Sequence, residues 1–135
     1  LAVLALNPHA SEGGNIGTED LDVVGPVVHE LRKERLKIDG PFPADAFFGR
    51  YKPGMYDAII AMYHDQGLIP LKMSSFGKAV NISVGLNIVR TSPDHGTAFD
   101  IAGKGIADSG SMIEAIKLAA QMAINRGVFY KGKKR

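Results

Sequence analysis

The sequence contains no cysteine among its 135 residues. This excludes a disulfide framework and any metal site built on thiolates, so a metal would have to be held by histidine and carboxylate side chains. It also lacks a strong excess of positive or negative charge, with 16 Lys and Arg against 14 Asp and Glu. This balance does not predict a nucleic-acid-binding protein. No apolar run approaches the roughly 18 residues that a membrane-spanning helix needs, so no membrane span is predicted.

What is present is ordinary globular composition, with 45% hydrophobic and 22% charged residues. Four positive charges gather within residues 131–135, which we expect to form a basic, mobile tail. Residue 1 is leucine, and an apolar run starts there without a polar lead. We therefore expect the chain to be the C-terminal portion of a longer protein. Residues 1–135 are predicted to form one compact α/β unit.

Apolar runs at 1–6 and 57–62 are typical of strands that are buried on both faces of a parallel sheet. The pattern also predicts strands at 36–38, 79–84 and 87–90, helices at 18–34 and 112–125, and a helical turn at 43–48. The short apolar segment 68–73 is not assigned to a helix. Because strands alternate with helices, the predicted class is α/β, with a mainly parallel sheet and flanking helices.

Two loops stand out because each directly follows a predicted buried strand and carries a histidine, His9 in one and His64 in the other. In open parallel sheets, ligands bind beyond the carboxyl ends of the strands. If the two strands are neighbours, both imidazoles lie at the same edge of the sheet, where they could hold a divalent metal. The alternative is two hydrogen-bonded structural histidines. We interpret His29, on the predicted helix 18–34, as structural.

The segment 91–105 is polar, rich in glycine and long for a loop within a compact domain, which favours a functional role. Its backbone N–H groups could surround a nucleotide, and Asp100 could accept hydrogen bonds from a ribose diol. The segment does not carry the usual dinucleotide fingerprint, so a structural glycine-rich turn is the alternative.

Cations and one amide occur near the predicted strands in the middle of the chain. Lys72, Lys78 and Arg90 have the charge that suits a phosphate or carboxylate ligand, although solvated surface cations are more common. Asn81 lies in an otherwise apolar strand. If it is buried it needs hydrogen-bond partners, which a ligand could supply.

Four motifs in the same order resemble the 4-hydroxythreonine-4-phosphate dehydrogenase family of pyridoxine biosynthesis. They are Asn-Pro-His-Ala-x-Glu-Gly-Gly at 7–14, Met-Tyr-His-Asp-Gln-Gly at 62–67, Ala-Val-Asn-Ile at 79–82 and Arg-Thr-Ser-x-Asp-His-Gly-Thr-Ala at 90–98. The resemblance extends from residue 1 to about residue 125. Residues 94–105 also look like the nucleotide loop of the wider isocitrate and isopropylmalate dehydrogenase superfamily, which implies a fold of that type.

The resemblance implies a cytoplasmic, NAD-dependent homodimer with a shared active site. It would oxidise the 3-hydroxyl of 4-phosphooxy-L-threonine, and the β-keto acid would then lose carbon dioxide. It implies a divalent metal (zinc, magnesium or cobalt) held by three histidines from both subunits. Carried onto this sequence, the metal ligands are His9 and His64, the substrate contacts are Lys72, Asn81 and Arg90, and the residues beside NAD are His95 and Asp100.

One departure from the family affects what this chain can do. The third metal histidine belongs to the family's N-terminal portion, which these residues do not include, so we expect residues 1–135 alone to be inactive. The position of Pro70 differs from that in the best-known members. It keeps open a related dehydrogenase of threonate or erythronate 4-phosphate. Two non-catalytic alternatives remain, a metal- or phosphate-binding fragment and a dimerisation domain.

Overall fold

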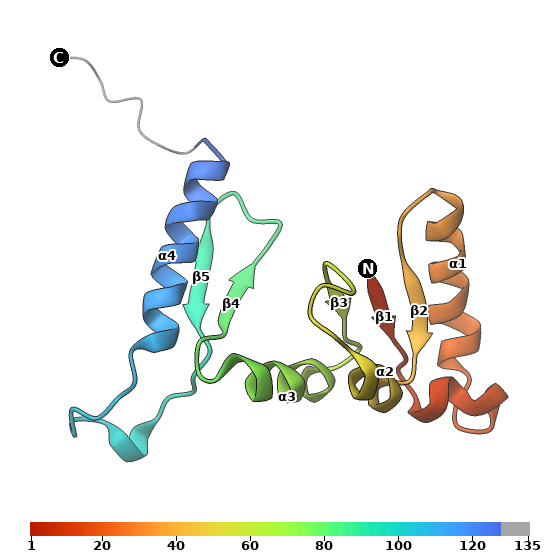
Figure 1. The fold of residues 1–135 in the computed structure, drawn as a ribbon, viewed down its shortest axis with the longest axis horizontal. Helices are drawn as coiled ribbons and strands as arrows, with labels where there is room; N and C mark the ends of the chain where they lie inside the picture. The colour runs from red at the N-terminus through yellow and green to blue at the C-terminus, as the bar shows by residue number, and fades with distance from the viewer. Residues whose placement is uncertain (128–135) are drawn as a thin grey trace. The chain divides into compact units, whose positions relative to one another are not determined.

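The computed structural model describes residues 1–127, and their contacts fall into two compact units. The first unit is Leu1–Leu71 and the second begins at Lys72 (Figure 1). The single compact α/β unit predicted for residues 1–135 stays a prediction. The predicted tail at 131–135 lies outside the described residues. None of the helices in the described part is long and apolar enough to cross a membrane.

The first unit is built on a parallel sheet of three strands, β1 (Ala2–Leu4), β2 (Asp39–Phe42) and β3 (Ile59–Ile60). β1 is central, in the order β2-β1-β3, and both pairings are parallel. The predicted α/β class with a parallel sheet is therefore confirmed. The two predicted buried strands also prove to be neighbours, because Ala2 pairs with Ile59 and Val3 with Ile60.

β1 is buried on both faces because its side chains alternate between two clusters. Ala2 and Leu4 pack with Phe47 on one face. Val3 packs with Val28 and Ile38 on the other. The sheet is thereby covered on both sides, as a parallel sheet requires.

Each face of the sheet has its own helix. The Val3 face is covered by α1 (Gly25–Lys33), which continues directly from the π-helical turn η2 (Asp20–Val24). The Leu4 face is covered by α2 (Ala44–Arg50), whose Phe47 ring lies 5.5 Å from Phe42, 5.7 Å from Tyr51 and 5.8 Å from Tyr56, measured between ring centroids. The helices predicted at 18–34 and 43–48 are confirmed with small shifts.

The strand predicted at 36–38 is wrong, because β2 lies at Asp39–Phe42. Gly40 and Pro41 favour a turn in the sequence, yet they are part of this strand. β2 is an edge strand, where a proline without an N–H is tolerated. The two ends of β2 are bonded to residues that flank β1. Asp39 N donates to Leu1 O at 2.9 Å, and Ala5 N donates to Phe42 O at 2.7 Å.

The region after β3 also differs from the prediction. β3 has two residues in place of the six expected at 57–62, and Ile60 is exposed. It is followed by α3 (His64–Ser75), which contains Pro70. The pattern gave no helix there because proline within a helix removes one hydrogen bond and crowds the preceding turn.

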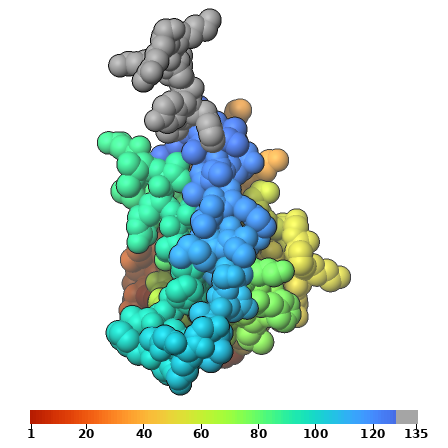
Figure 2. All heavy atoms as spheres, turned by 90° about the vertical axis from the view of Figure 1, so that its left-hand side faces the viewer, coloured from red at the N-terminus to blue at the C-terminus, as the bar shows by residue number. Residues whose placement is uncertain are grey.

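In the second unit, an antiparallel hairpin packs against one long helix. β4 (Val80–Ser83) pairs with β5 (Arg90–Pro93), and α4 (Gly110–Asn125) lies alongside them (Figure 1). Figure 2 faces this unit, with α4 in blue and the segment around residue 100 in cyan. The predicted hairpin and the helix at 112–125 are confirmed, with β5 three residues later than expected. The loop after β5 holds one short 3-10 turn, η3 (Phe99–Ile101).

Gly40 allows β2 to approach β1 closely, which leads to a prediction about stability. Its φ is +132°, and a Cβ there would run into the Val3 backbone carbonyl. We expect Gly40→Ala to lower the free energy of unfolding by about 2 kcal/mol or more. Gly49→Ala is the control, because its Cβ would meet nothing within 4 Å and it lies in α2. It should leave stability unchanged or raise it by up to about 1 kcal/mol. Urea denaturation compares the two, and equal stabilities would contradict this account of the strand contact.

Candidate active site

The loop after β1 carries His9 in a left-handed conformation. In the 3-10 segment η1 (Pro8–Gly14), four consecutive non-glycine residues have positive φ: His9 at 52°, Ala10 at 51°, Ser11 at 69° and Glu12 at 44°. Left-handed backbone costs an L-residue roughly 1–2 kcal/mol, so such a run persists only where surrounding contacts fix it. The loop is therefore a specified conformation that presents the His9 imidazole at the surface.

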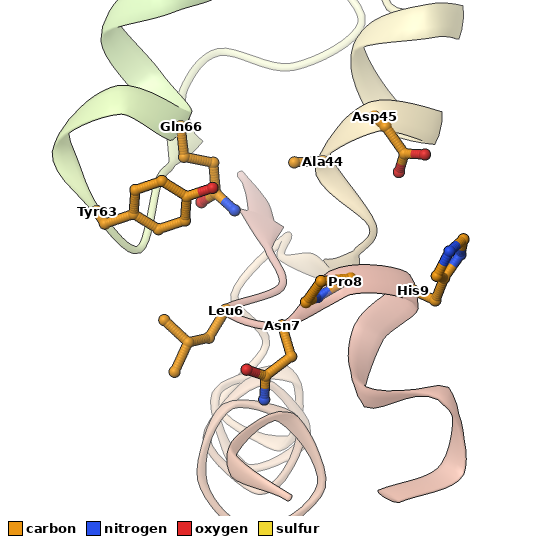
Figure 3. A pocket seen from close by; sticks show the side chains of 8 residues that line it. All are labelled: Leu6, Asn7, Pro8, His9, Ala44, Asp45, Tyr63 and Gln66. Carbon is orange, nitrogen blue, oxygen red and sulfur yellow. The ribbon is translucent and has the colours of Figure 1, made fainter. Parts of the chain in front are cut away.

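A pocket of about 240 Å³ opens beside this loop. Its lining comes from the end of β1, from η1, from the start of α2 and from the start of α3: Leu6, Asn7, Pro8, His9, Ala44, Asp45, Tyr63 and Gln66. Figure 3 shows Tyr63 and Gln66 on one side, with Asp45 and His9 on the other. The pocket thus lies where the carboxyl end of the central strand meets two helix N-termini, the usual ligand position in such sheets.

His64 follows β3 and begins α3, and its side chain is 77% exposed. Its Nδ1 lies 2.6 Å from Oδ1 of Asp65. When Nδ1 carries the proton and donates to this carboxylate, Nε2 keeps its lone pair for a ligand. A carboxylate in this position is the usual outer partner of a metal-binding imidazole, because it fixes the tautomer and raises the basicity of the ring.

Gln66 joins the two strand ends that lead to these histidines. Its Nε2 donates to Ala5 O at 2.7 Å, and its Oε1 accepts from Met62 N at 2.8 Å. The side chain is buried, so both bonds replace contacts that water would otherwise make. Gln66 therefore ties the residue after β1 to the turn before α3.

The donor set of the first unit fits part of a metal site. His9 and His64 follow the carboxyl ends of adjacent parallel strands, and neutral imidazole is a good ligand for borderline divalent ions. Within residues 1–127, no group of three or more His, Asp or Glu side chains is placed to hold an ion. The residues described here thus offer two imidazoles and no complete ligand set of their own.

In the second unit, Lys72 is held by a carboxylate. Its Nζ lies 3.0 Å from Oδ2 of Asp94, whose backbone N–H donates to the Ser111 hydroxyl at 2.7 Å. Ser111 is buried and donates in turn to Ala79 O at 2.6 Å. Because the Lys72 side chain is 53% exposed, this ion pair contributes at most about 1 kcal/mol. A more highly charged anion can therefore displace the Asp94 carboxylate from the Lys72 ammonium or bind the ammonium together with it.

The other predicted substrate residues lie on the hairpin. Arg90 begins β5 and donates to the Ser83 hydroxyl at 2.8 Å. Asn81 lies in β4 opposite Ser92, and it is exposed rather than buried. The argument that Asn81 needs a ligand because it is buried is therefore wrong. Its predicted role depends on the family motif alone.

The predicted cofactor residues lie on the loop between β5 and α4. The imidazole Nδ1 of His95 lies 3.0 Å from Gly96 O, and Asp100 is in the turn η3. Both side chains are exposed. They are accessible to a ligand, and their assignment to a nucleotide stays a prediction.

Comparison with known proteins identifies the family. The family model described as pyridoxal phosphate biosynthetic protein PdxA matches residues 1–119. The chain belongs to this family. Relatives named 4-hydroxythreonine-4-phosphate dehydrogenase include one from Caulobacter vibrioides, 56% identical over 128 residues, and one from Aromatoleum aromaticum, 53% identical over 128 residues. Each alignment covers 95% of this chain, but only 38% and 39% of the relative.

Solved structures agree with the PdxA assignment. A 4-hydroxythreonine-4-phosphate dehydrogenase from Klebsiella pneumoniae matches with a TM-score of 0.75 at 50% identity. A terephthalate 1,2-cis-dihydrodioldehydrogenase from Burkholderia xenovorans LB400 matches with a TM-score of 0.63 at 38% identity. Each match covers 90% of this chain and 37% or 38% of the solved one. The chain thus spans well under half the length of the proteins it matches.

Sequence reasoning missed three buried polar residues that shape the first unit's site. They are Ser11, Asp20 and Gln66. Gln66 could have been suspected from its place beside His64 after a strand. Acidic residues are common in the first turn of a helix, so the sequence offers no reason to expect that Asp20 contacts the end of β1. Nothing in the sequence marks Ser11 as buried.

The exposed rim of the η1 loop provides a pH-dependent test. Asn7 Nδ2 donates to Glu19 Oε2 at 2.6 Å, and this hydrogen bond is the main reason that the pKa of Glu19 lies below its usual value. We expect Asn7→Ala to raise the pKa of Glu19 toward 4.5. The bond stabilises the loop above that ordinary pKa and is lost as the pH falls through the lowered one.

Carboxyl resonances followed by NMR across the acid range measure this change. Glu114 is the internal control, because the ammonium of Lys117 lowers the pKa of its carboxyl in the second unit. The pKa of Glu114 should be the same in both proteins. If the pKa of Glu19 also stays unchanged in Asn7→Ala, the contact does not hold in solution.

Proposed function

We propose that this chain is part of an NAD- and metal-dependent dehydrogenase that oxidises the 3-hydroxyl of 4-phosphooxy-L-threonine in pyridoxal phosphate biosynthesis. The observation that carries the proposal is the placement of His9 and His64 after adjacent parallel strands in a chain of the PdxA family, with His9 lining a pocket. The names of the relatives supply the substrate. A cytoplasmic homodimer with a shared site is part of the same proposal.

His9 and His64 are proposed to hold the divalent ion, zinc, magnesium or cobalt, and imidazole suits zinc and similar borderline ions best. A third ligand would come from a part of the protein beyond these residues. When bound, such an ion stabilises the negative charge that develops on the substrate oxygens during oxidation and decarboxylation. Asp65 keeps the ring of His64 in the tautomer that leaves Nε2 available.

Lys72, Asn81 and Arg90 are proposed to bind the substrate. The two cations suit its phosphate and carboxylate, because charged donors form strong hydrogen bonds to these groups. The Asp94 carboxylate keeps the ammonium of Lys72 in place until an anion arrives. Holding the substrate in one orientation contributes much of the rate enhancement, because its carbinol carbon must face the hydride acceptor.

NAD is proposed as the oxidant: when bound, it would supply the acceptor for the hydride of the carbinol carbon, and the hydroxyl proton would pass to solvent. His95 and Asp100 are proposed to lie beside it. Asp100 would accept a hydrogen bond from a ribose hydroxyl and would repel a 2′-phosphate, which favours NAD over NADP. Because no group of three ligating side chains is found among residues 1–127, residues 1–135 alone are proposed to be inactive.

One alternative keeps the chemistry and changes the substrate. A solved neighbour named terephthalate 1,2-cis-dihydrodioldehydrogenase supports the view that one fold can serve more than one substrate. Phosphorylated four-carbon sugar acids, threonate or erythronate 4-phosphate, remain the runner-up because Pro70 departs from the usual family pattern.

The direct test is an assay of the intact polypeptide that contains these residues. With a divalent metal present, we expect 4-phosphooxy-L-threonine to drive NAD reduction and carbon dioxide release. Threonate 4-phosphate is the comparison substrate. Faster turnover with threonate 4-phosphate would move the protein to the alternative, and no NAD reduction with either would contradict the proposal.

The metal ligands are tested separately by substitution. In His9→Ala and His64→Ala, the affinity of the intact protein for Zn²⁺ should fall by about 10-fold or more, since each removes a ligand. His29→Ala is the matched control, because His29 lies exposed on α1 and is interpreted as structural. Isothermal titration measures the affinities. Unchanged binding in both ligand variants would remove the metal site from these residues.

A further inference from the structure

We propose that Asp20 is the positioning residue of the His9 loop, so that its carboxylate, which touches no ligand, determines whether His9 can bind a metal. This inference rests on the proposed function for the metal and on geometry for the contact. Asp20 is 2% exposed and begins η2, eleven residues after His9. Its side chain turns back to the point where β1 ends.

Both carboxylate oxygens of Asp20 are used. Oδ1 accepts from Leu6 N at 2.7 Å, and Oδ2 accepts from Asn7 N at 2.9 Å. These two N–H groups directly follow β1, where the chain leaves the sheet and its ladder ends. Buried N–H groups at such a place need acceptors, and a single carboxylate satisfies both. The direction in which the loop leaves the strand is thereby fixed.

The same carboxylate also holds the middle of the loop through Ser11. The Ser11 hydroxyl donates to Asp20 Oδ2 at 3.0 Å and accepts from Asn7 Nδ2 at 3.2 Å. Ser11 is fully buried although its φ is +69°. The left-handed run that includes His9 is therefore held at two points, at Asn7 before it and at Ser11 within it.

A buried carboxylate is stable only where hydrogen bonds replace its lost water. Asp20 obtains all three of its bonds from the loop and none of the three from its own helix. A carboxylate that only favoured the helix N-terminus would bond to N–H groups of η2. The geometry thus assigns Asp20 to the loop, and through it to the imidazole of His9.

Asp20→Asn tests this with the smallest change, because it replaces one acceptor oxygen by an NH₂ group that cannot accept from Asn7 N or Ser11. In the intact protein we expect the affinity for Co²⁺ to fall by about 10-fold or more, as for other outer partners of a metal ligand. The visible absorption of bound Co²⁺ should also change, which a loss of stability alone would not cause. Asp22→Asn is the matched control, since Asp22 is exposed in the same turn. It should bind Co²⁺ with the affinity and spectrum of the unaltered protein.

Amide hydrogen exchange gives a second readout that needs no metal. In Asp20→Asn, the N–H groups of Leu6 and Asn7 should exchange faster. The N–H of Ala5, bonded to Phe42 O within the sheet, should keep its protection. If the unaltered protein binds no Co²⁺, the proposed metal site fails, and exchange alone then tests the hold of Asp20 on the loop. Unchanged exchange at Leu6 and Asn7 overturns the inference.

If Asp20→Asn does not fold, Ser11→Ala replaces it, because this change removes one hydrogen bond and leaves the two backbone bonds of Asp20. The affinity for Co²⁺ should then fall by about 3-fold or more, the effect of one buried hydrogen bond. Affinity and spectrum equal to those of the unaltered protein, in either folded variant, would overturn the inference.

Discussion

The carboxylate of Asp20 at the end of β1 is the contact on which the first unit's site depends. β1 is the most buried strand, and the chain leaves it through two N–H groups that no neighbouring strand satisfies. Asp20 accepts from both and thereby converts the end of a strand into the start of a left-handed loop. Gln66 satisfies a backbone carbonyl at the same strand end, since its amide donates to Ala5 O. Gln66 thus lines the pocket beside His9, and Asp20 holds Leu6 and Asn7, which line it too.

This arrangement explains how two exposed histidines, His9 in the η1 loop and His64 at the start of α3, are placed by the core. β1 and β3 are parallel neighbours, so the segments that follow them leave the sheet on the same side, at its carboxyl end. The alternating clusters around Val3 and Leu4 hold β1 between two helices. A rigid sheet with functional loops at its carboxyl edge is the common solution in α/β proteins, because packing and chemistry then use different residues.

The sequence was most informative where a pattern depends on local physics. The apolar run at 1–6 and the amphipathic run at 112–125 predicted β1 and α4, and β1 and β3 are neighbours as the histidine hypothesis requires. It failed where tertiary contacts override local preference. Gly40 and Pro41 form part of a strand because β1 lies beside them, and Pro70 lies within α3. Asp20 has the sequence signature of a helix start, and only the fold brings it to Leu6.

The second unit is held differently. Ala79 and Ala115 are its buried hydrophobic side chains in the described part of the chain, and Phe76, Val84 and Phe99 are each at least 80% exposed. Its order comes from hydrogen bonds, with Ser111 joining β4 to the loop at Asp94 and Thr91 donating to Ala115 O at 2.9 Å.

His9 and His64 are proposed to be ligands of one metal ion. Anomalous diffraction at the zinc edge, from crystals of the intact protein grown with Zn²⁺, shows whether they are. We expect one peak bonded to an imidazole nitrogen of both residues. A peak bonded to only one of them, or an ordered zinc that contacts neither, would contradict it.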